Sequence, residues 1–209
     1  MYSVFVHTKE QYDVVKNYPV SMIYTDNESL LKEDKNIYYQ VPRYPHEREL
    51  PQNILIQDLG CLLETHDKNI VTDTNLNVAK SLAIEKLLSL GVSKITLSLE
   101  CTLNELKFLN KASEYPLEVV LYGRPEVMLL KSYPLIKENG YELEDYEKKK
   151  YPILVDQEKH VHIYQYEVMN KLDLQKDYET LGIHHFRLQF IFETKEEVTK
   201  IMDKIYHLE

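Results

Sequence analysis

Short apolar runs alternate with helix-sized or polar segments along most of the chain. The first run, Tyr2–His7, has the β-branched and aromatic content of a strand, and Lys9–Tyr18 after it has helical spacing. The same patterns predict seven further strands, at Val20–Tyr24, Asn36–Val41, Asn53–Asp58, Asn69–Thr72, Lys94–Leu99, Leu117–Tyr122 and Phe186–Phe192. Eight strands that mostly alternate with helices or helix-sized gaps predict a small, irregular (β/α)8 barrel of the TIM type, and an open α/β sheet is the alternative.

Three later helices are marked by their ends as well as by their periodicity. The clearest is Asn77–Leu90, which Gly91 follows as a C′ residue and whose expected inner face consists of Val78, Leu82, Ile84, Leu87 and Leu88. Two capping boxes predict the others, Thr102 with Glu105 before a helix through Asn110, and Thr194 with Glu197 before the amphipathic helix Glu196–Leu208.

The alternation changes character near the C-terminus. Short alternating runs at Tyr141–Leu143, Tyr151–Val155 and His160–Tyr166 are separated by the polar turns Lys148–Lys150 and Asp156–Lys159. We therefore predict an α/β fold of one domain, residues 1–209, in which an antiparallel β-ribbon of about residues 137–170 is inserted into the barrel.

Bulk properties narrow the class of protein. The 209 residues are 44% hydrophobic, enough for one sizeable core, and the net charge of −9 argues against DNA or nonspecific nucleic-acid binding. No apolar run approaches the roughly 20 residues of a membrane span, and the N-terminus lacks a signal-peptide pattern, so we expect a cytoplasmic protein. Cys61 and Cys101 are far apart and are expected to be buried thiols.

The strand Leu117–Tyr122 ends abruptly in Gly123, Arg124 and Pro125. Glycine permits unusual backbone angles, and proline disfavours helical geometry at the residue before it, so Arg124 is expected at a bend. Its planar guanidinium suits a carboxylate or phosphate. The alternative is an ion pair with an acid of a neighbouring strand.

The carboxyl ends of barrel strands form the functional face of this fold. On the predicted strands that rule selects His7, Asp26, Arg43, Asp58, Asp73, Asn75, Asn77, Ser98, Glu100, Tyr122 and Arg124. Asp73, Ser98, Glu100 and Arg124 fall on successive strands, so their side chains can converge. The carboxylates could then serve as acid and base or bind a cation, and the arginine could stabilise an anion. A structural ring of ion pairs around the barrel mouth is the alternative.

The segment YGRPEVM, Tyr122–Met128, resembles the YGRxPLM element of peptidase family U32, the collagenase-like proteases. Three further segments are similar to the same family in the same order, DTNLNVAKS at Asp73–Ser81, TLSLECTLNEL at Thr96–Leu106 and YELEDYEKKKYPI at Tyr141–Ile153. The resemblance covers about Ile54–Phe192 and implies a barrel-like fold. It adds weight to the positions that match its motifs, and we predict Asp73, Glu100 and Arg124 as catalytic residues and Asn77, Ser98, Tyr122 and Asp145 as substrate-binding residues.

The chain departs from the family pattern at the position of a cofactor ligand. Relatives with an iron–sulfur cluster hold it with cysteines, one in an HCP-like triplet after the GRxPLM element, and here that triplet is Ser132, Tyr133 and Pro134. Two cysteines cannot supply four ligands, so no iron–sulfur cluster or other cofactor is expected.

Other common site signatures are absent from the sequence. It contains no GxSxG, HExxH, P-loop or GxGxxG. His160 and His162 alternate along a predicted strand and face the same way, as a metal site requires, but no third ligand is apparent. We therefore predict a surface ribbon and no metal there, and a loop at His184 and His185.

Two functions are compatible with these features. The first is a U32 peptidase-like protease or hydrolase with its site at the C-terminal mouth of the barrel, although no nucleophile–base pair is evident. The second is a noncatalytic, degenerate U32 module that binds RNA, a peptide or a protein partner, which the missing cysteines favour.

Overall fold

The computed structural model describes residues 1–44, 49–63, 65, 67–109, 114–133, 136 and 140–207. The chain divides into two compact units. We call Met1–Leu121 with Lys171–Glu209 the barrel unit, and Tyr122–Asn170 the ribbon unit.

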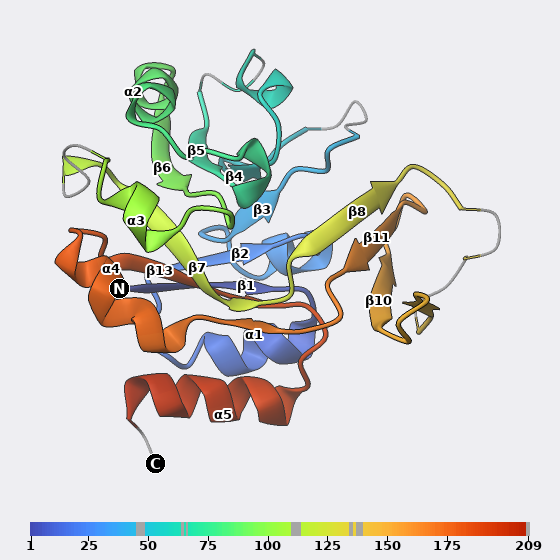
Figure 1. Cartoon of the computed structure of the whole chain (residues 1–209). Coiled ribbons are helices and arrows are strands. Elements are labelled where there is room, and N and C mark those ends of the chain that lie inside the picture. Colours follow the sequence, from blue (N-terminus) through green and yellow to red (C-terminus); the bar gives the residue numbers. More distant parts are fainter. Residues whose placement is uncertain are drawn as a thin grey trace. The chain divides into compact units, whose positions relative to one another are not determined.

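Eight parallel strands close into a barrel, as the sequence predicts (Figure 1). Around the barrel the order is β7-β13-β1-β2-β3-β4-β5-β6, and β7 pairs with both β6 and β13 to close it. The strands are β1 (Tyr2–Val6), β2 (Met22–Thr25), β3 (Tyr38–Gln40), β4 (Asn53–Ile56), β5 (Asn69–Thr72), β6 (Val92–Thr96), β7 (Leu117–Gly123) and β13 (His185–Phe190).

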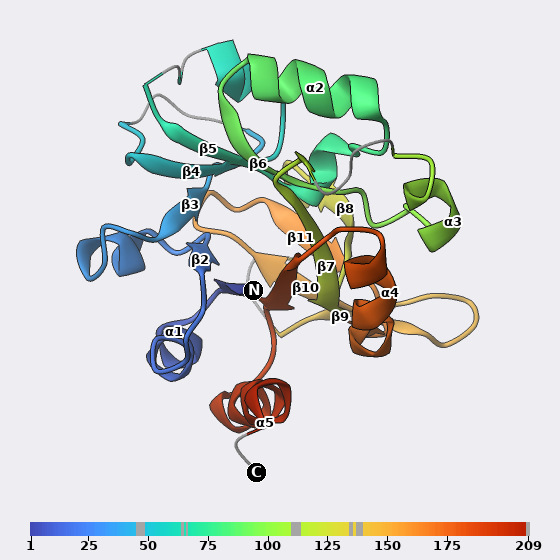
Figure 2. The ribbon, with the colours of Figure 1, turned by 90° about the vertical axis from the view of Figure 1, so that its left-hand side faces the viewer.

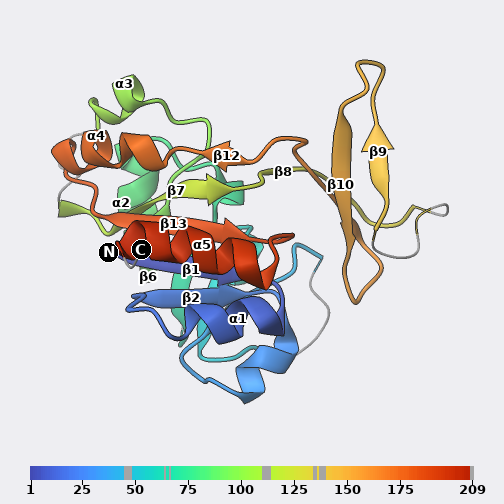
Figure 3. The ribbon, with the colours of Figure 1, turned by 90° about the horizontal axis from the view of Figure 1, so that it is seen from below.

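The helical layer of the barrel unit is thin. Its α-helices are α1 (Lys9–Val15), α2 (Ser81–Ser89), α3 (Leu103–Leu106), α4 (Gln175–Thr180) and α5 (Lys195–Tyr206), and short 3-10 helices lie at η1 (Glu28–Lys32), η2 (Gly60–Leu63), η3 (Thr74–Leu76) and η5 (Leu172–Leu174). Helix α2 packs on β6 (Figure 2), and α1 and α5 lie side by side against the sheet (Figure 3). None of the helices in the described part of the chain is both long and apolar enough to cross a membrane.

Both predicted capping boxes are present. The Thr102 and Thr194 side chains accept hydrogen bonds from the backbone N–H groups of Glu105 and Glu197, and each glutamate side chain bonds back to the cap. Each box satisfies backbone donors that a helix start leaves without a partner in the helix.

The predicted start of α2 is wrong. The helix begins at Ser81, because Asn77 takes a left-handed conformation (φ 53°, ψ 44°) that ends η3 and interrupts helical geometry. Leu82, placed on the inner face by periodicity, is 77% exposed. The residues that do point inward include Val78, Ile84 and Leu87.

Alternation along the barrel strands separates two environments. Leu117, Val119 and Leu121 of β7 belong to the main apolar cluster, together with residues of α2 such as Ile84 and Leu87. The residue between the first two, Glu118, is fully buried and contacts side chains of other strands. The barrel therefore has an apolar outside under its helices, and the charged side chain of Glu118 lies on its inner face.

The ribbon unit contains a four-stranded antiparallel sheet of order β8-β11-β10-β9. Its strands are β8 (Glu126–Leu130), β9 (Glu142–Glu144), β10 (Lys150–Val155) and β11 (Val161–Tyr164), and β12 (Met169–Asn170) pairs with the end of β7. The predicted antiparallel ribbon is confirmed by the pairing of β9, β10 and β11. The sequence pattern predicts no strand at β8, whose Val127 and Met128 are exposed while Leu130 packs on the apolar cluster of the ribbon.

Gly123 at the end of β7 has φ 140°, a backbone angle that side chains disfavour. We expect Gly123→Ala to lower the free energy of unfolding by about 1 kcal/mol or more, because the added Cβ is strained in this conformation. Urea denaturation followed by circular dichroism measures the change. An unchanged midpoint would show that the backbone relaxes at no cost.

Candidate active site at the mouth of the barrel

A histidine and an aspartate meet where β1 and β2 end. Val6 of β1 pairs with Thr25 of β2, so the residues that follow them, His7 and Asp26, lie side by side at the carboxyl edge. The Nδ1 atom of His7 is 2.8 Å from Oδ1 and 2.9 Å from Oδ2 of Asp26. Both side chains are 26% exposed, so protein surrounds most of the pair and part of each side chain is exposed to solvent.

Local hydrogen bonds hold the backbone of this pair. The N–H of His7 donates to Oε1 of Gln11 at 2.8 Å, and Nδ2 of Asn27 donates to the carbonyl of His7 at 3.2 Å. An ionised carboxylate only accepts, so Nδ1 of His7 is the donor toward Asp26, and the lone pair of the neutral ring lies on Nε2. These contacts fix the position and the orientation of the His7 ring.

Inside the barrel, Arg187 of β13 is the centre of a buried charge network. Its Nε donates to Oε2 of Glu118 at 2.6 Å, its Nη1 to Oδ1 of Asp73 at 2.7 Å, and its Nη2 to Oγ1 of Thr96 at 2.6 Å. The guanidinium also lies 4.3 Å from the centre of the Tyr24 ring. Arg187 and Glu118 have no exposed surface, so this network supports the barrel and does not present a charge to solvent.

Glu118 receives hydrogen bonds from further strands as well. Ser3 and Tyr24 donate to Oε1 at 2.6 and 3.0 Å, and the Nζ of Lys94 lies 3.4 Å from the same atom. Burial alone would raise the pKa of Glu118, but the nearby Arg187 and Lys94 charges outweigh it and lower that pKa to about 2.

The Glu118 pKa predicts acid-sensitive stability. Its ordinary value is 4.5, so the stabilisation is present above that pH and is lost as the pH falls toward about 2. The shift corresponds to on the order of 3 kcal/mol. We expect Glu118→Gln to lower the stability at pH 7 and to flatten its dependence between about pH 5 and 2 in urea titrations. Parallel curves for the wild type and the variant would contradict this.

The predicted site residues of the barrel unit separate into different environments. Asp73 is 4% exposed, and its carboxylate accepts from Arg187, from Gln40 at 2.7 Å and from the backbone of Thr74. Asn77 accepts a short hydrogen bond from the Ser98 hydroxyl, which brings these two predicted residues together. A catalytic role of Asp73 stays a prediction, since its described partners are those of the barrel interior.

Glu100 lies beyond β6 and lines an open groove of about 750 Å³. The groove also contains Lys171, whose pKa is lowered by burial and whose Nζ donates to the carbonyl of Leu99 at 3.3 Å. Cys101, buried as predicted, lines the same groove. His7 and Asp26 are not among the residues that line the groove, so the groove and the His7–Asp26 pair are separate features.

The remaining predicted residues belong to the ribbon unit. The Nη1 of Arg124 donates to the carbonyls of Gln165 and Tyr166 at 3.0 and 2.6 Å, which fastens two segments of that unit. Asp145 accepts from the backbone of Glu147 and Lys149 in the turn between β9 and β10. Tyr122 is half-buried on β7. These contacts give Arg124 and Asp145 structural partners, and their ligand-binding roles stay predictions.

Comparisons with known proteins add little to this geometry. No family model matches the chain, and no curated protein matches it either. Among solved structures it is similar to the spore cortex-lytic enzyme SleL of Bacillus megaterium QM B1551. That similarity has 8% sequence identity and a TM-score of 0.43 over 97% of this chain and 73% of the other. A likeness this small carries no functional argument, so the site is argued from its own residues.

Glu118 and Arg187, which the sequence analysis does not select, nevertheless have a signal in the sequence. Each is a charged residue within a run that reads as a buried strand, LEVVLYG and HFRLQF. A charge in such a position requires a partner, because burying it alone is costly. The sequence therefore indicates an ion pair between Glu118 and Arg187 inside the barrel. No local pattern indicates that Asp73 belongs to the same ion network.

Proposed function

We propose that this protein is a hydrolase in which His7, oriented by Asp26, acts as general base at the mouth of the barrel. The observation that carries the proposal is the contact between Nδ1 of His7 and both carboxylate oxygens of Asp26. Such a pair fixes the ring and makes Nε2 the nitrogen that takes a proton from water or from a hydroxyl in this scheme. The location supports this role, since barrel enzymes carry their chemistry at the carboxyl ends of the strands.

Peptides are the substrate class that we propose first. This choice rests on the resemblance of Tyr122–Met128 and three other segments to the U32 peptidases. In this scheme Nε2 of His7 takes a proton from a water molecule as its oxygen bonds to the peptide carbonyl carbon, and the carboxylate of Asp26 stabilises the imidazolium that forms. The imidazolium then returns the proton to the amine that leaves as the C–N bond breaks. No iron–sulfur cluster takes part, because Cys61 and Cys101 cannot provide four ligands.

A second candidate is a noncatalytic module that binds a peptide, RNA or a protein partner. The observation that favours it is that the Asp73 carboxylate is buried in the barrel interior by Arg187, Gln40 and Thr74. A carboxylate with this many hydrogen bonds inside the barrel is suited to support the fold. The open groove beside Glu100 then serves as the binding surface.

Turnover of denatured collagen, casein and a panel of chromogenic esters and glycosides separates the two candidates. The wild type is compared with His7→Asn and with His184→Asn, which changes an exposed histidine of the same unit. Hydrolysis that is lost only in His7→Asn supports the hydrolase. If the wild type hydrolyses every substrate no faster than His7→Asn does, the hydrolase is rejected in favour of the binding module.

A further inference from the structure

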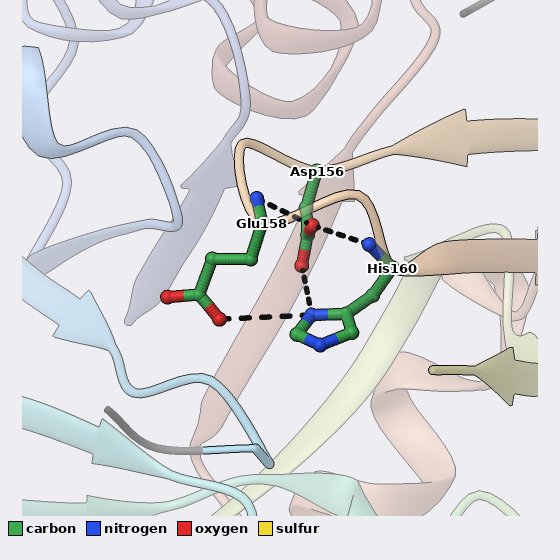
Figure 4. A group of neighbouring side chains, drawn as sticks. All are labelled: Asp156, Glu158 and His160. Carbon is green, nitrogen blue, oxygen red and sulfur yellow. Dashed lines mark hydrogen bonds and ion pairs between the residues drawn. The ribbon is translucent and has the colours of Figure 1, made fainter. Parts of the chain in front are cut away.

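A second histidine-containing cluster lies in the ribbon unit, where β10 turns into β11. Figure 4 shows Asp156, Glu158 and His160 around this turn, with both carboxylates directed toward the imidazole. The potential ligand atoms of the three side chains all lie within 4.8 Å of one another. The sequence revealed only the histidines, since the two acids fall in a segment that reads as a polar turn.

The turn itself fixes the direction of the Asp156 side chain. Its Oδ1 accepts hydrogen bonds from the backbone N–H groups of Glu158 and His160 at 2.9 and 2.8 Å. Its other oxygen, Oδ2, is 2.9 Å from Nδ1 of His160 and 3.3 Å from Nε2 of His162. One carboxylate oxygen is therefore held by the backbone while the second faces two imidazoles.

The spacing of these atoms suits a small divalent cation. In a tetrahedral zinc site the ligand bonds are about 2.0–2.2 Å, which places donor atoms about 3.3–3.6 Å apart. Here Nδ1 of His160 is 3.6 Å from Oε2 of Glu158, and the two contacts of Oδ2 of Asp156 are 2.9 and 3.3 Å. Asp156, Glu158 and His160 thus place three donor atoms within 4.8 Å of one another, and Nε2 of His162 lies beside the Asp156 donor.

The orientation of His162 is an independent observation. Its Nδ1 is 2.9 Å from Oε2 of Glu126 on the neighbouring strand β8, while its Nε2 faces Asp156. Histidines that bind metals usually donate their other ring N–H to a carboxylate in this way, which fixes the ring and its tautomer.

We propose that Asp156, Glu158, His160 and His162 form a binding site for Zn²⁺ or a similar first-row divalent cation, with Glu126 as the positioning residue of His162. The two imidazoles favour such a metal over Mg²⁺ or Ca²⁺, which prefer oxygen ligands. His160 is buried and the other ligands are partly buried, so the ion would connect β11 to the preceding turn. This site is independent of the proposed hydrolase.

The test is metal binding by the full chain after treatment with a chelator. Zn²⁺ titrated in competition with a chromophoric chelator should give a single saturable site. We expect His160→Asn to weaken binding by about 100-fold and Glu126→Gln by about tenfold. Co²⁺ should give visible absorption bands of a nitrogen-containing site, and these bands should be lost in His160→Asn.

Two further variants keep the outcome interpretable. His184→Asn removes a histidine outside the cluster and should bind Zn²⁺ as the wild type does. Glu158→Gln preserves side-chain shape and should weaken binding even if His160→Asn fails to fold. The proposal is overturned if the wild type shows no saturable site, or if His160→Asn and Glu158→Gln bind as tightly as the wild type.

Discussion

Replacing Arg187 by methionine is expected to lower the free energy of unfolding by about 3–5 kcal/mol, the largest stability change that we predict. Methionine fills much of the same space but leaves the carboxylates of Glu118 and Asp73 without their cation. Their side chains are 0% and 5% exposed, so water cannot replace the lost contact. Urea denaturation at neutral pH measures the loss.

Lys200→Met provides the matched control. Lys200 is an exposed cation of α5, and its loss should change stability by no more than about 0.5 kcal/mol. The double variant Arg187→Met/Glu118→Gln should lose less stability than the sum of the two single variants. Glu118→Gln removes a carboxylate charge that Arg187→Met leaves without its cation. A loss below about 1 kcal/mol for Arg187→Met would refute the central role of this ion network.

The second large effect concerns catalysis. On a substrate that the wild type hydrolyses, His7→Asn should lower kcat by about 10²–10⁴-fold, the usual contribution of a general base. KM should change little, because the imidazole transfers a proton and does not bind the substrate tightly. Initial rates over a range of substrate concentrations separate kcat from KM.

Asp26→Asn tests the orienting partner in the same assay. Its amide can donate to Nδ1 of His7, which would place the proton on Nε2 and remove the base. We expect a fall in kcat of similar size with the barrel still folded by circular dichroism. Full activity in Asp26→Asn would mean that His7 does not depend on this contact.

The barrel could be predicted from sequence because its strands are marked twice, by apolar content and by the polar residues that end them. Leu117–Gly123 shows this well, with buried residues from Leu117 to Leu121 before the strand ends at Gly123. The start of α2 could not be predicted, because Asn77 takes its left-handed conformation at the end of the 3-10 helix η3. A helix as short as η3 leaves no periodic pattern of apolar residues in the sequence. Strand β8 depends on pairing with β11, a contact distant in sequence.

The candidate site was predictable in part. The rule that strand ends carry the chemistry selects both His7 and Asp26, yet it gives no reason to prefer them to the other residues at the mouth. Their pairing follows from the register of β1 and β2, which is a tertiary property. The same limit explains why Asp73 was grouped with Glu100 when its partner is Arg187, 114 positions away.

Chemical rescue tests the central claim that His7 supplies the base. The variant His7→Ala leaves space beside Asp26 for a small molecule, so added imidazole should restore part of the hydrolysis in a saturable, concentration-dependent manner. Imidazole should not rescue Arg187→Met, whose defect is structural. The account predicts this restoration in His7→Ala alone, and a His7→Ala variant that hydrolyses substrate as fast as the wild type without imidazole would contradict it.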